Sequence, residues 1–360
     1  MERRKTRAVF KGRVQVGGGA PVSVQSMTTT HTEDVAGTVR QIHELDEAGC
    51  DIIRVAIPTM NAARAIAEIK KQICIPLVAD IHFDHRLALE SIKQGADCVR
   101  INPGNMRSED DVAEVVGAAK DAGISMRVGV NSGSIRPRAG MEVRGTDDLA
   151  GLMVEAALRH CEFIESLGFG DVILSLKASD VPATIAANRA VAARCDYPIH
   201  LGVTAAGPLE VATVKSAVGI GGLLAEGIGD TIRVSLTGPP IGEVRLGHEI
   251  LRAVGLEEAG LEIISCPTCG RCDIDLAALV EEVRARLPPS DSPLRIAIMG
   301  CVVNGPGEAA EADVGIAGGK GFGFLFRGGR KLRKVPESEL ADALLDEIAV
   351  MLDSAGGNVE

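Results

Sequence analysis

Short apolar runs alternate with longer amphipathic stretches through the first 255 residues of the chain. The runs are dominated by Val, Ile and Leu, which is typical of β-strands. The stretches between them repeat their apolar positions with helical spacing, so a helix is expected between successive strands. The expected strands lie at residues 21–27, 51–57, 76–83, 97–103, 125–131, 171–177, 198–204 and 230–236.

Two of the expected helices carry recognisable end signals. Thr32 is expected to cap the first helix, and Ser108 the helix that ends at Gly123. Repeated strand–helix units imply parallel strands joined by helical crossovers, and eight units in about 250 residues match a closed (β/α)8 TIM barrel. A doubly wound open sheet is the alternative. No G-x-G-x-x-G follows the first strand, which weakens a dinucleotide-binding version of that alternative.

The pattern changes near Gly255, where the regular alternation stops. The expected elements beyond this point are strands at 261–265 and 294–300, helices at 274–287 and 337–352, and a hairpin at 321–335. The mixture indicates a separate, smaller α+β domain. The sequence therefore predicts a substrate-binding barrel domain at residues 1–255 and a second domain at residues 256–360.

Polar side chains recur near the C-terminal ends of the expected barrel strands. Side chains two apart point to the same side of a strand, and barrel enzymes have their active sites at these strand ends. The polar set consists of Arg54, Asp80, His82, Arg100, Asn102, Arg127, Asn131, Ser175, Lys177, His200, Thr204, Arg233 and Ser235. Five of these residues are Arg or Lys, and one is acidic. Because burying several cations together is costly, we expect a compensating ligand with at least two negative charges, most simply a diphosphate.

Composition and charge exclude several classes of partner. The net charge of −11, one Tyr and the absence of Trp argue against nucleic acid. The N-terminus lacks the apolar segment of a secretory signal, and no apolar run is long enough to span a membrane. We therefore expect a soluble cytoplasmic protein with no nucleic-acid or membrane partner.

The nine cysteines fall into two groups. Cys50, Cys74, Cys98, Cys161 and Cys195 are scattered through apolar surroundings and are expected to be buried. The other group is Cys266, Cys269, Cys272 and Cys301, spaced C-x2-C-x2-C with one remote cysteine, as in bacterial ferredoxins. Spacing alone predicts an iron–sulfur cluster with four cysteine ligands. A structural zinc site is the alternative, although no second cysteine pair and no His after His248 completes one.

Several longer segments resemble a known family. "PLVADIHF" (76–83), "HLGVTAAG" (200–207), "AEGIGDTIRVSL" (225–236), "CPTCGRC" (266–272) and "MGCVVNGPGEA" (299–309) resemble the bacterial 4-hydroxy-3-methylbut-2-enyl diphosphate synthases, in order along essentially the whole chain. The resemblance implies a TIM barrel followed by a small [4Fe-4S] domain similar to a sulfite-reductase module. It implies reductive ring opening of 2-C-methyl-D-erythritol 2,4-cyclodiphosphate, by two electrons and with loss of water. It also implies flavodoxin or ferredoxin as electron donor, and a homodimer in which each cluster domain covers the partner's barrel.

The resemblance also implies roles for individual residues. The positions that hold the diphosphate are Arg54, Arg100, Asn102, Arg127, Asn131, Lys177 and Ser235, and those near the ring are Asp80 and His82. Glu226 matches a glutamate implicated in catalysis, although its position in the sequence favours a solvated residue at a helix end. The implied cluster ligands are Cys266, Cys269, Cys301 and Glu308, which leaves Cys272 as a bystander. An oxygen ligand exchanges more readily than a thiolate, so Glu308 would leave one iron accessible.

Two positions depart from the family's usual pattern. The family's Thr-Glu-Ala-Gly is Thr204-Ala205-Ala206-Gly207 here, which removes a carboxylate. Its frequent Gly-Ser-Leu-Glu is Gly133-Ser134-Ile135-Arg136 here, which adds a positive charge near the expected pocket.

Overall fold

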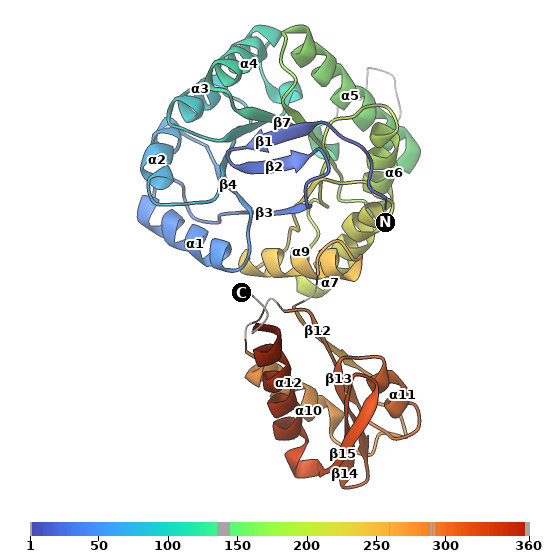
Figure 1. The fold of residues 1–360 in the computed structure, drawn as a ribbon. Coiled ribbons are helices and arrows are strands. Elements are labelled where there is room, and N and C mark those ends of the chain that lie inside the picture. The colour runs from blue at the N-terminus through green and yellow to red at the C-terminus, as the bar shows by residue number, and fades with distance from the viewer. Residues whose placement is uncertain (1, 135–144, 259, 289, 291, 357–360) are drawn as a thin grey trace. The chain divides into compact units, whose positions relative to one another are not determined.

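The computed structural model describes residues 2–134, 145–258, 260–288, 290 and 292–356. The chain divides into two compact units, Met1–Glu257 and Glu258–Glu360 (Figure 1). Arg136, expected near the pocket, lies outside the described residues. No helix among the described residues is long and apolar enough to cross a membrane.

Eight parallel strands form a barrel in the N-terminal unit. Their spatial order is β8-β7-β6-β5-β4-β3-β10-β9, and a bridge between Leu174 and Ile199 joins the two ends. The strands are β3 (Ser23–Met27), β4 (Ile52–Ala56), β5 (Leu77–Asp80), β6 (Cys98–Ile101), β7 (Ser125–Asn131), β8 (Val172–Lys177), β9 (His200–Leu201) and β10 (Thr231–Ile232). All eight expected strands are present, and the expected (β/α)8 architecture is confirmed.

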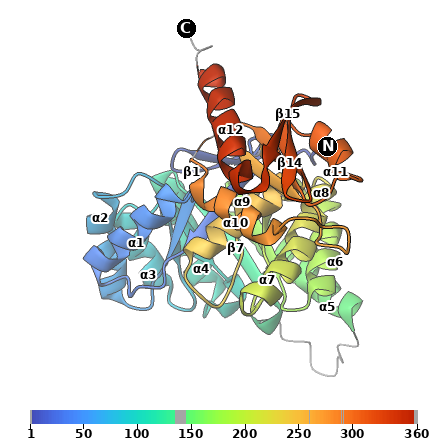
Figure 2. The same ribbon diagram turned by 90° about the horizontal axis from the view of Figure 1, so that it is seen from below.

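Helices surround the barrel (Figures 1 and 2). They are α1 (Val35–Glu47), α2 (Met60–Lys70), α3 (His85–Lys93), α4 (Glu109–Ala122), α5 (Thr146–Ser166), α6 (Val181–Ala192), α7 (Leu209–Ser216), the π-helical turn η3 (Ala217–Gly221), α8 (Gly222–Ala225) and α9 (Ile241–Ala253), with short 3-10 turns at η1 (Pro103–Asn105) and η2 (Ser132–Ser134).

The ends of two helices test the expected caps. Ser108 caps α4 by accepting from the Asp111 N–H, and Gly123 ends that helix with a left-handed φ of 65°. Both expectations are confirmed. The expectation that Thr32 caps α1 is wrong. The Thr32 hydroxyl donates to the Ala56 carbonyl at 2.6 Å, and Asp34 accepts from the Gly37 N–H as the cap.

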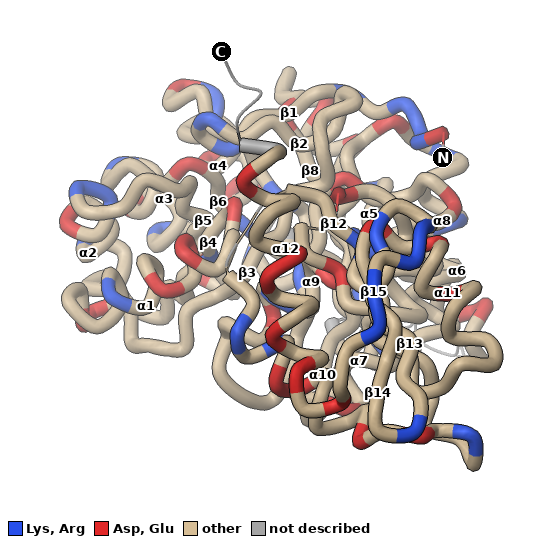
Figure 3. Tube along the Cα trace, turned by 60° about the horizontal axis from the view of Figure 1, so that its bottom comes forward, with Lys and Arg blue, Asp and Glu red and all other residues tan. Residues whose placement is uncertain are grey.

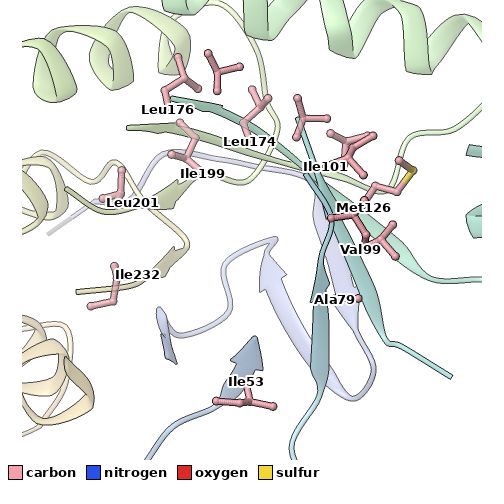
Figure 4. Packing of buried hydrophobic residues seen from close by; sticks show 14 of the residues in the cluster. Ile53, Ala79, Val99, Ile101, Met126, Leu174, Leu176, Ile199, Leu201 and Ile232 are labelled. Atoms are coloured by element: carbon pink, nitrogen blue, oxygen red, sulfur yellow. The ribbon is translucent and has the colours of Figure 1, made fainter. Parts of the chain in front are cut away.

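Strand alternation separates an apolar outer layer from a polar interior. Val, Ile and Leu side chains on the outward faces pack beneath the helices, and Figure 4 shows part of this cluster, including Leu174 and Ile199. The alternate positions, such as Arg100 and Arg127, point into the barrel, where they are almost fully buried. The outer layer supplies most of the apolar burial, which leaves the interior free to carry polar groups.

A hairpin that the sequence did not predict closes the N-terminal end of the barrel. It pairs β1 (Ala8–Lys11) with β2 (Val14–Gly17) and crosses the barrel's centre in Figure 1. Val9 and Val16 pack against the inward side chains at the start of the barrel strands, a ring that consists of Ile52, Val78, Cys98 and Ile173. Water is therefore excluded from the barrel at this end.

The C-terminal unit is a five-stranded sheet with helices on both faces. Its elements are β11 (Leu261–Ser265), α10 (Leu276–Arg286), β12 (Leu294–Met299), α11 (Gly305–Ala310), β13 (Val314–Gly319), β14 (Phe322–Arg327), β15 (Arg330–Pro336), the 3-10 turn η4 (Glu337–Glu339) and α12 (Leu340–Gly356), with the strands in chain order across the sheet. α10 and α12 cover one face, and α11 covers the other. The sequence predicted this α+β class but missed α11 and β13, because their Gly and Pro residues are typical of turns.

All nine cysteines are free thiols. In the scattered group, Cys50, Cys98 and Cys161 are buried as expected. Cys195 is half-buried, and the expectation for Cys74 is wrong, because its side chain is exposed. Cys74 lies in the short loop between α2 and β5, where the chain reaches the surface.

Lys11, at the end of β1, is buried in the barrel's interior. Its Nζ has no hydrogen-bond partner among the described residues. Burial lowers the pKa of Lys11 to about 7, and the positive charges of Arg127 and Arg54 add to this effect. The cations inside the barrel therefore disfavour protonation of Lys11, whose side chain enters from the N-terminal end of the strands.

We predict that Lys11→Met removes a pH dependence from the stability of the chain. Between the folded pKa of about 7 and an unfolded value of about 10.4, the unfolded chain binds more protons, so stability rises with pH by about 1.4 kcal/mol per unit. The methionine variant should lack this contribution and be more stable near neutral pH. Urea unfolding between about pH 7 and pH 9 measures the slope.

Lys71→Met, at an exposed lysine after α2, is the matched control and should keep the wild-type slope. Equal slopes for Lys11→Met and the wild type would contradict the burial of an unpaired ammonium at this position.

Candidate functional site

A pocket of about 110 Å³ opens at the C-terminal ends of the barrel strands. Its lining comes from β4 through β10 and the residues that follow them, so side chains distant in sequence converge on one cavity. The lining residues are Arg54, Asp80, His82, Arg100, Arg127, Asn131, Ser175, Lys177, Thr204, Arg233 and Ser235. The structure thus brings together eight of the nine substrate-binding residues expected from the sequence.

Asp80 is the one carboxylate in this lining. Its Oδ1 lies 3.2 Å from Arg100 Nη1, and its Oδ2 lies 3.8 Å from Arg54 Nε and 3.5 Å from His82 Nε2. Burial alone would raise the pKa of Asp80, but Arg54, His82 and Arg100 together hold it well below its usual range. Asp80 is therefore ionised at neutral pH and compensates one positive charge.

The remaining positive charge is poorly compensated. Burial lowers the pKa of Arg54 to about 10 and lowers the pKa values of Arg127 and Lys177 well below their ordinary values. The neighbouring cations lower all three pKa values further. An anionic ligand would reverse both effects, because it supplies the opposite charge at short range. The pocket is therefore built for a multiply charged anion.

Two residues that the sequence pattern did not indicate hold the cations in place. Gln25, on β3, accepts a 2.9 Å hydrogen bond from Arg127 Nη1, across the barrel from β7. Glu243, on α9, accepts from Arg233 Nη2 at 3.0 Å and from Arg233 Nε at 3.2 Å. Arg233 also donates to Ser235 Oγ at 2.8 Å. The alternation of polar residues in β3 could have indicated Gln25, whereas Glu243 meets Arg233 only through the fold.

Three residues expected at the site lie elsewhere. Asn102 is buried, does not line the pocket, and accepts from the Gly104 N–H at 3.2 Å in the loop after β6. His200 is fully buried inside the barrel, and burial together with Lys177 lowers its pKa well below the ordinary value. Glu226 precedes β10, at the end of the barrel opposite the pocket, and accepts from Arg189 Nε at 2.8 Å. The structure thus places Glu226 where the sequence position alone suggested, at a partly exposed helix end.

Ala205 occupies the position of the family's usual glutamate. Its φ of 50° is in the left-handed region, which is uncommon for a residue other than Gly. The adjacent Thr204 lines the pocket, so a glutamate at position 205 would stand close to the pocket's edge.

The cysteine loop lies at one end of the C-terminal sheet. It follows β11, and the Gly300 N–H at the end of β12 donates to Cys266 Sγ at 3.2 Å. Cys301 comes next and is buried, whereas Cys269 is exposed. Hydrogen bonds from the backbone and side chain of Arg271 lower the pKa of the Cys269 thiol, which favours its thiolate form. Glu308 lies in α11, which packs against β12 and β13.

Cys272 and Cys266 are both half-buried, and both sulfurs lie next to Gly300. Both cysteines pack against the apolar cluster beneath α10 and α12, and Cys272 Sγ donates to the Ile274 carbonyl at 3.3 Å. A side chain at Gly300 would collide with this sulfur, so the glycine permits the close approach. The hydrogen bond to the Ile274 carbonyl therefore distinguishes Cys272 from Cys266.

The four residues expected to hold a cluster come from neighbouring elements. Within the described part of the chain, no group of three or more His, Cys, Asp or Glu side chains is arranged to ligate a single metal ion. A four-iron cluster has a ligand on each iron, which spreads its ligands more widely than one ion does. Three thiols and a carboxylate on adjacent segments fit that donor set in chemistry and placement.

We predict that Arg54→Ala weakens the binding of inorganic pyrophosphate by about 10- to 100-fold, because charge-assisted hydrogen bonds are lost from a buried site. Arg64→Ala removes an exposed guanidinium from α2 and should change the affinity by less than about twofold. Isothermal titration calorimetry at fixed ionic strength measures both. Equal pyrophosphate affinities for Arg54→Ala and the wild type would show that this pocket is not the anion site.

Comparison with known proteins places the geometry in a family. Residues 6–248 match the family model of the GcpE TIM-barrel domain, and residues 262–350 match that of the GcpE protein C-terminal domain. A protein of Symbiobacterium thermophilum named 4-hydroxy-3-methylbut-2-en-1-yl diphosphate synthase (flavodoxin) is 55% identical, over 96% of this chain and 93% of its own. Proteins of the same name from Thermodesulfovibrio yellowstonii and Geobacter sulfurreducens are each 53% identical, over 97% of this chain and 99% and 98% of their own lengths.

Solved structures share the barrel with this chain. A Yersinia pestis DHPS with a pterine-sulfa conjugate superposes with a TM-score of 0.51 at 10% identity, over 69% of this chain and 98% of that chain. This likeness concerns the fold alone. Because the two family models match most of the chain, and relatives with more than half of their residues identical span nearly all of it, the chain belongs to the GcpE family.

Proposed function

We propose that this protein is a 4-hydroxy-3-methylbut-2-enyl diphosphate synthase that opens the ring of 2-C-methyl-D-erythritol 2,4-cyclodiphosphate by reduction. Written for the neutral acids, the substrate takes up two electrons and two protons and yields the linear allylic diphosphate and one water. The observation that carries the proposal is the pocket itself, in which five cationic side chains face only two carboxylates, Asp80 in the lining and Glu243 behind Arg233. The names of the relatives support the same activity.

In this proposal the barrel binds the diphosphate and fixes its orientation. Arg54, Arg100, Arg127 and Lys177 supply the opposite charge, and Ser235 and Asn131 line the same cavity. Gln25 and Glu243 hold two of the guanidinium groups before the ligand arrives, so fewer side chains need to be ordered on binding. Binding energy from the diphosphate then positions the reacting carbons.

Asp80 and His82 are proposed to act at the carbon end of the substrate. The ionised Asp80 carboxylate is 3.5 Å from His82 Nε2 and can orient the imidazole. An imidazole held in this way can give a proton to a departing oxygen and accept one in return. We do not assign Glu226 to this step, because it lies at the other end of the barrel.

The C-terminal unit is proposed to hold a [4Fe-4S] cluster through Cys266, Cys269, Cys301 and Glu308. When bound, such a cluster supplies single electrons at low potential to the carbon–oxygen bonds that are cleaved. The exposed Cys269 beside Arg271 favours the thiolate that cluster binding requires. The hydrogen bond that Cys272 Sγ donates to the Ile274 carbonyl supports its role as a bystander, because it engages the protonated thiol and not the thiolate that ligates metal.

The proposal includes a flavodoxin or ferredoxin as electron donor, a homodimer and a cytoplasmic location. Flavodoxin is part of the relatives' names. The nine free thiols fit a reducing compartment, where structural disulfides are rare. Analytical ultracentrifugation of the cluster-loaded chain tests the dimer.

We predict that the chain, reconstituted anaerobically, contains iron and acid-labile sulfide in about equal amounts. It should convert the cyclodiphosphate to the allylic diphosphate when a reduced one-electron donor is supplied, and Arg54→Ala with a full cluster should turn over far more slowly. Bound zinc without sulfide would contradict the cluster. A full cluster with no turnover would instead favour an iron–sulfur carrier.

We predict that Cys272→Ser keeps its cluster and its turnover, because its thiol donates to the Ile274 carbonyl and is not a proposed ligand. Cys266→Ser, three residues before Cys269 in the same loop, should lose both, because it removes a proposed ligand. Iron and sulfide analysis together with the electron paramagnetic resonance spectrum of the reduced protein compare the two variants. Loss of the cluster in Cys272→Ser alone would indicate ligation by cysteines only.

A further inference from the structure

The edge strand β15 carries four exposed basic residues, two on either side of the exposed Leu332. Its sequence is RKLRKVP, and its first five residues are exposed. β15 ends the sheet, so one of its sides has no neighbouring strand. Figure 3 shows basic residues along this strand. Such a concentration of positive charge is unexpected in a chain with a net charge of −11.

These basic side chains differ in their partners from several other arginines of the C-terminal unit. Arg286 pairs with Glu282 and Asp342, Arg295 with Glu262, and Arg327 with Glu347. Among the described residues, no carboxylate forms an ion pair with the β15 residues Arg330, Lys331, Arg333 and Lys334. The charge of this strand therefore remains available to a partner.

Two of the lysines lie over aromatic rings. Lys331 Nζ is 3.2 Å from the centroid of the Phe324 ring, and Lys334 Nζ is 3.7 Å from that of Phe322. The two rings are 5.4 Å apart and meet edge to face. These contacts fix the ammonium groups on the surface that α11 also covers, since Phe324 and Phe326 pack with Ala309 of that helix.

The same surface reaches the proposed cluster ligands. A side chain at Gly319 would contact both the Phe322 ring and the Val302 side chain, so those two groups lie together over this glycine. Val302 follows Cys301 directly, and Val302 and Val303 are 40% and 62% exposed. Exposed apolar side chains beside two unpaired lysines, close to the proposed cluster ligands, form a surface suited to a transient protein partner.

Neither protection of the sheet edge nor binding of nucleic acid accounts for the whole surface. Charged edge strands prevent edge-to-edge pairing, but this role needs neither the ordered Phe–Lys contacts nor the exposed valines. A nucleic acid would also bind the basic residues, but its phosphate backbone makes no use of the exposed Val302 and Val303. An acidic protein can contact both the cations and the valines.

We propose that β15, with Phe322, Phe324 and Val302, is the docking surface for an acidic one-electron donor protein of the flavodoxin kind. This inference rests on the proposed function and adds the place at which the electron donor binds. Complementary charge accelerates the encounter, and the apolar residues exclude water at the point nearest the cluster ligands.

The test compares two double variants of the cluster-loaded full chain. Lys331→Gln/Lys334→Gln should lower kcat/KM for reduced flavodoxin by about tenfold and weaken its binding in calorimetry, because two steering charges are lost. Arg284→Gln/Arg286→Gln removes two charges from α10, on the other face of the sheet, and should change kcat/KM by less than about twofold. Turnover with a small reduced viologen dye, which needs no docking surface, should be equal in all three proteins.

Each outcome has a distinct meaning. If the wild type fails with the viologen dye, the proposed function is wrong. If it succeeds and both variants equal it with flavodoxin, only the docking surface is wrong. Rising salt should lower the kcat/KM of the wild type for flavodoxin. A kcat/KM that does not fall would also overturn the docking surface. Oligonucleotide binding that Lys331→Gln/Lys334→Gln abolishes, with unchanged flavodoxin kinetics, would assign the strand to nucleic acid.

Discussion

The repulsion among cations inside the barrel is the constraint on which the N-terminal unit depends. Arg54, Arg100, Arg127 and Lys177 are directed into one cavity, and Asp80 compensates only part of their charge. A buried charge without a partner costs several kcal/mol, so the pocket is a destabilised part of the fold. Other parts of the fold must supply the free energy that offsets this cost. A dianionic ligand stabilises the folded chain on binding, because it compensates the buried cations.

The outer layer of the barrel is where that energy arises. The outward side chains of the strands are Val, Ile and Leu packed beneath the helices, and they are almost completely buried. The hairpin of β1 and β2 adds an apolar seal at the closed end, with Val9 and Val16 in contact with inward side chains. Polar interior and apolar exterior are thus two faces of the same strands, which explains why a barrel of this kind can hold so many charges.

Strand-level features of the site were predictable because they depend on local periodicity. A period of two placed Asp80 with His82 and Ser175 with Lys177, and all four line the pocket. Features set by long-range contacts were not predictable. Gln25 reaches Arg127 across the barrel, and Glu243 reaches Arg233 from a helix. Asn102 likewise lies two residues after Arg100, but its side chain accepts a hydrogen bond from the Gly104 N–H in a local turn. Periodicity thus predicts the direction of a side chain but not its partner.

In the C-terminal unit, the hydrophobic pattern alone did not reveal every helix and strand. Glycines in β13 and in α11 hid both elements, yet the same glycines permit close packing, since a side chain at Gly315 would collide with Ala297. That packing holds α11, and with it Glu308, against the strand that leads to Cys301. The spacing of three cysteines in seven residues could not distinguish ligands from a bystander, because Cys266 and Cys272 are both half-buried beside Gly300. What distinguishes Cys272 is the hydrogen bond that its thiol donates to the Ile274 carbonyl, and this contact exists only in the folded domain.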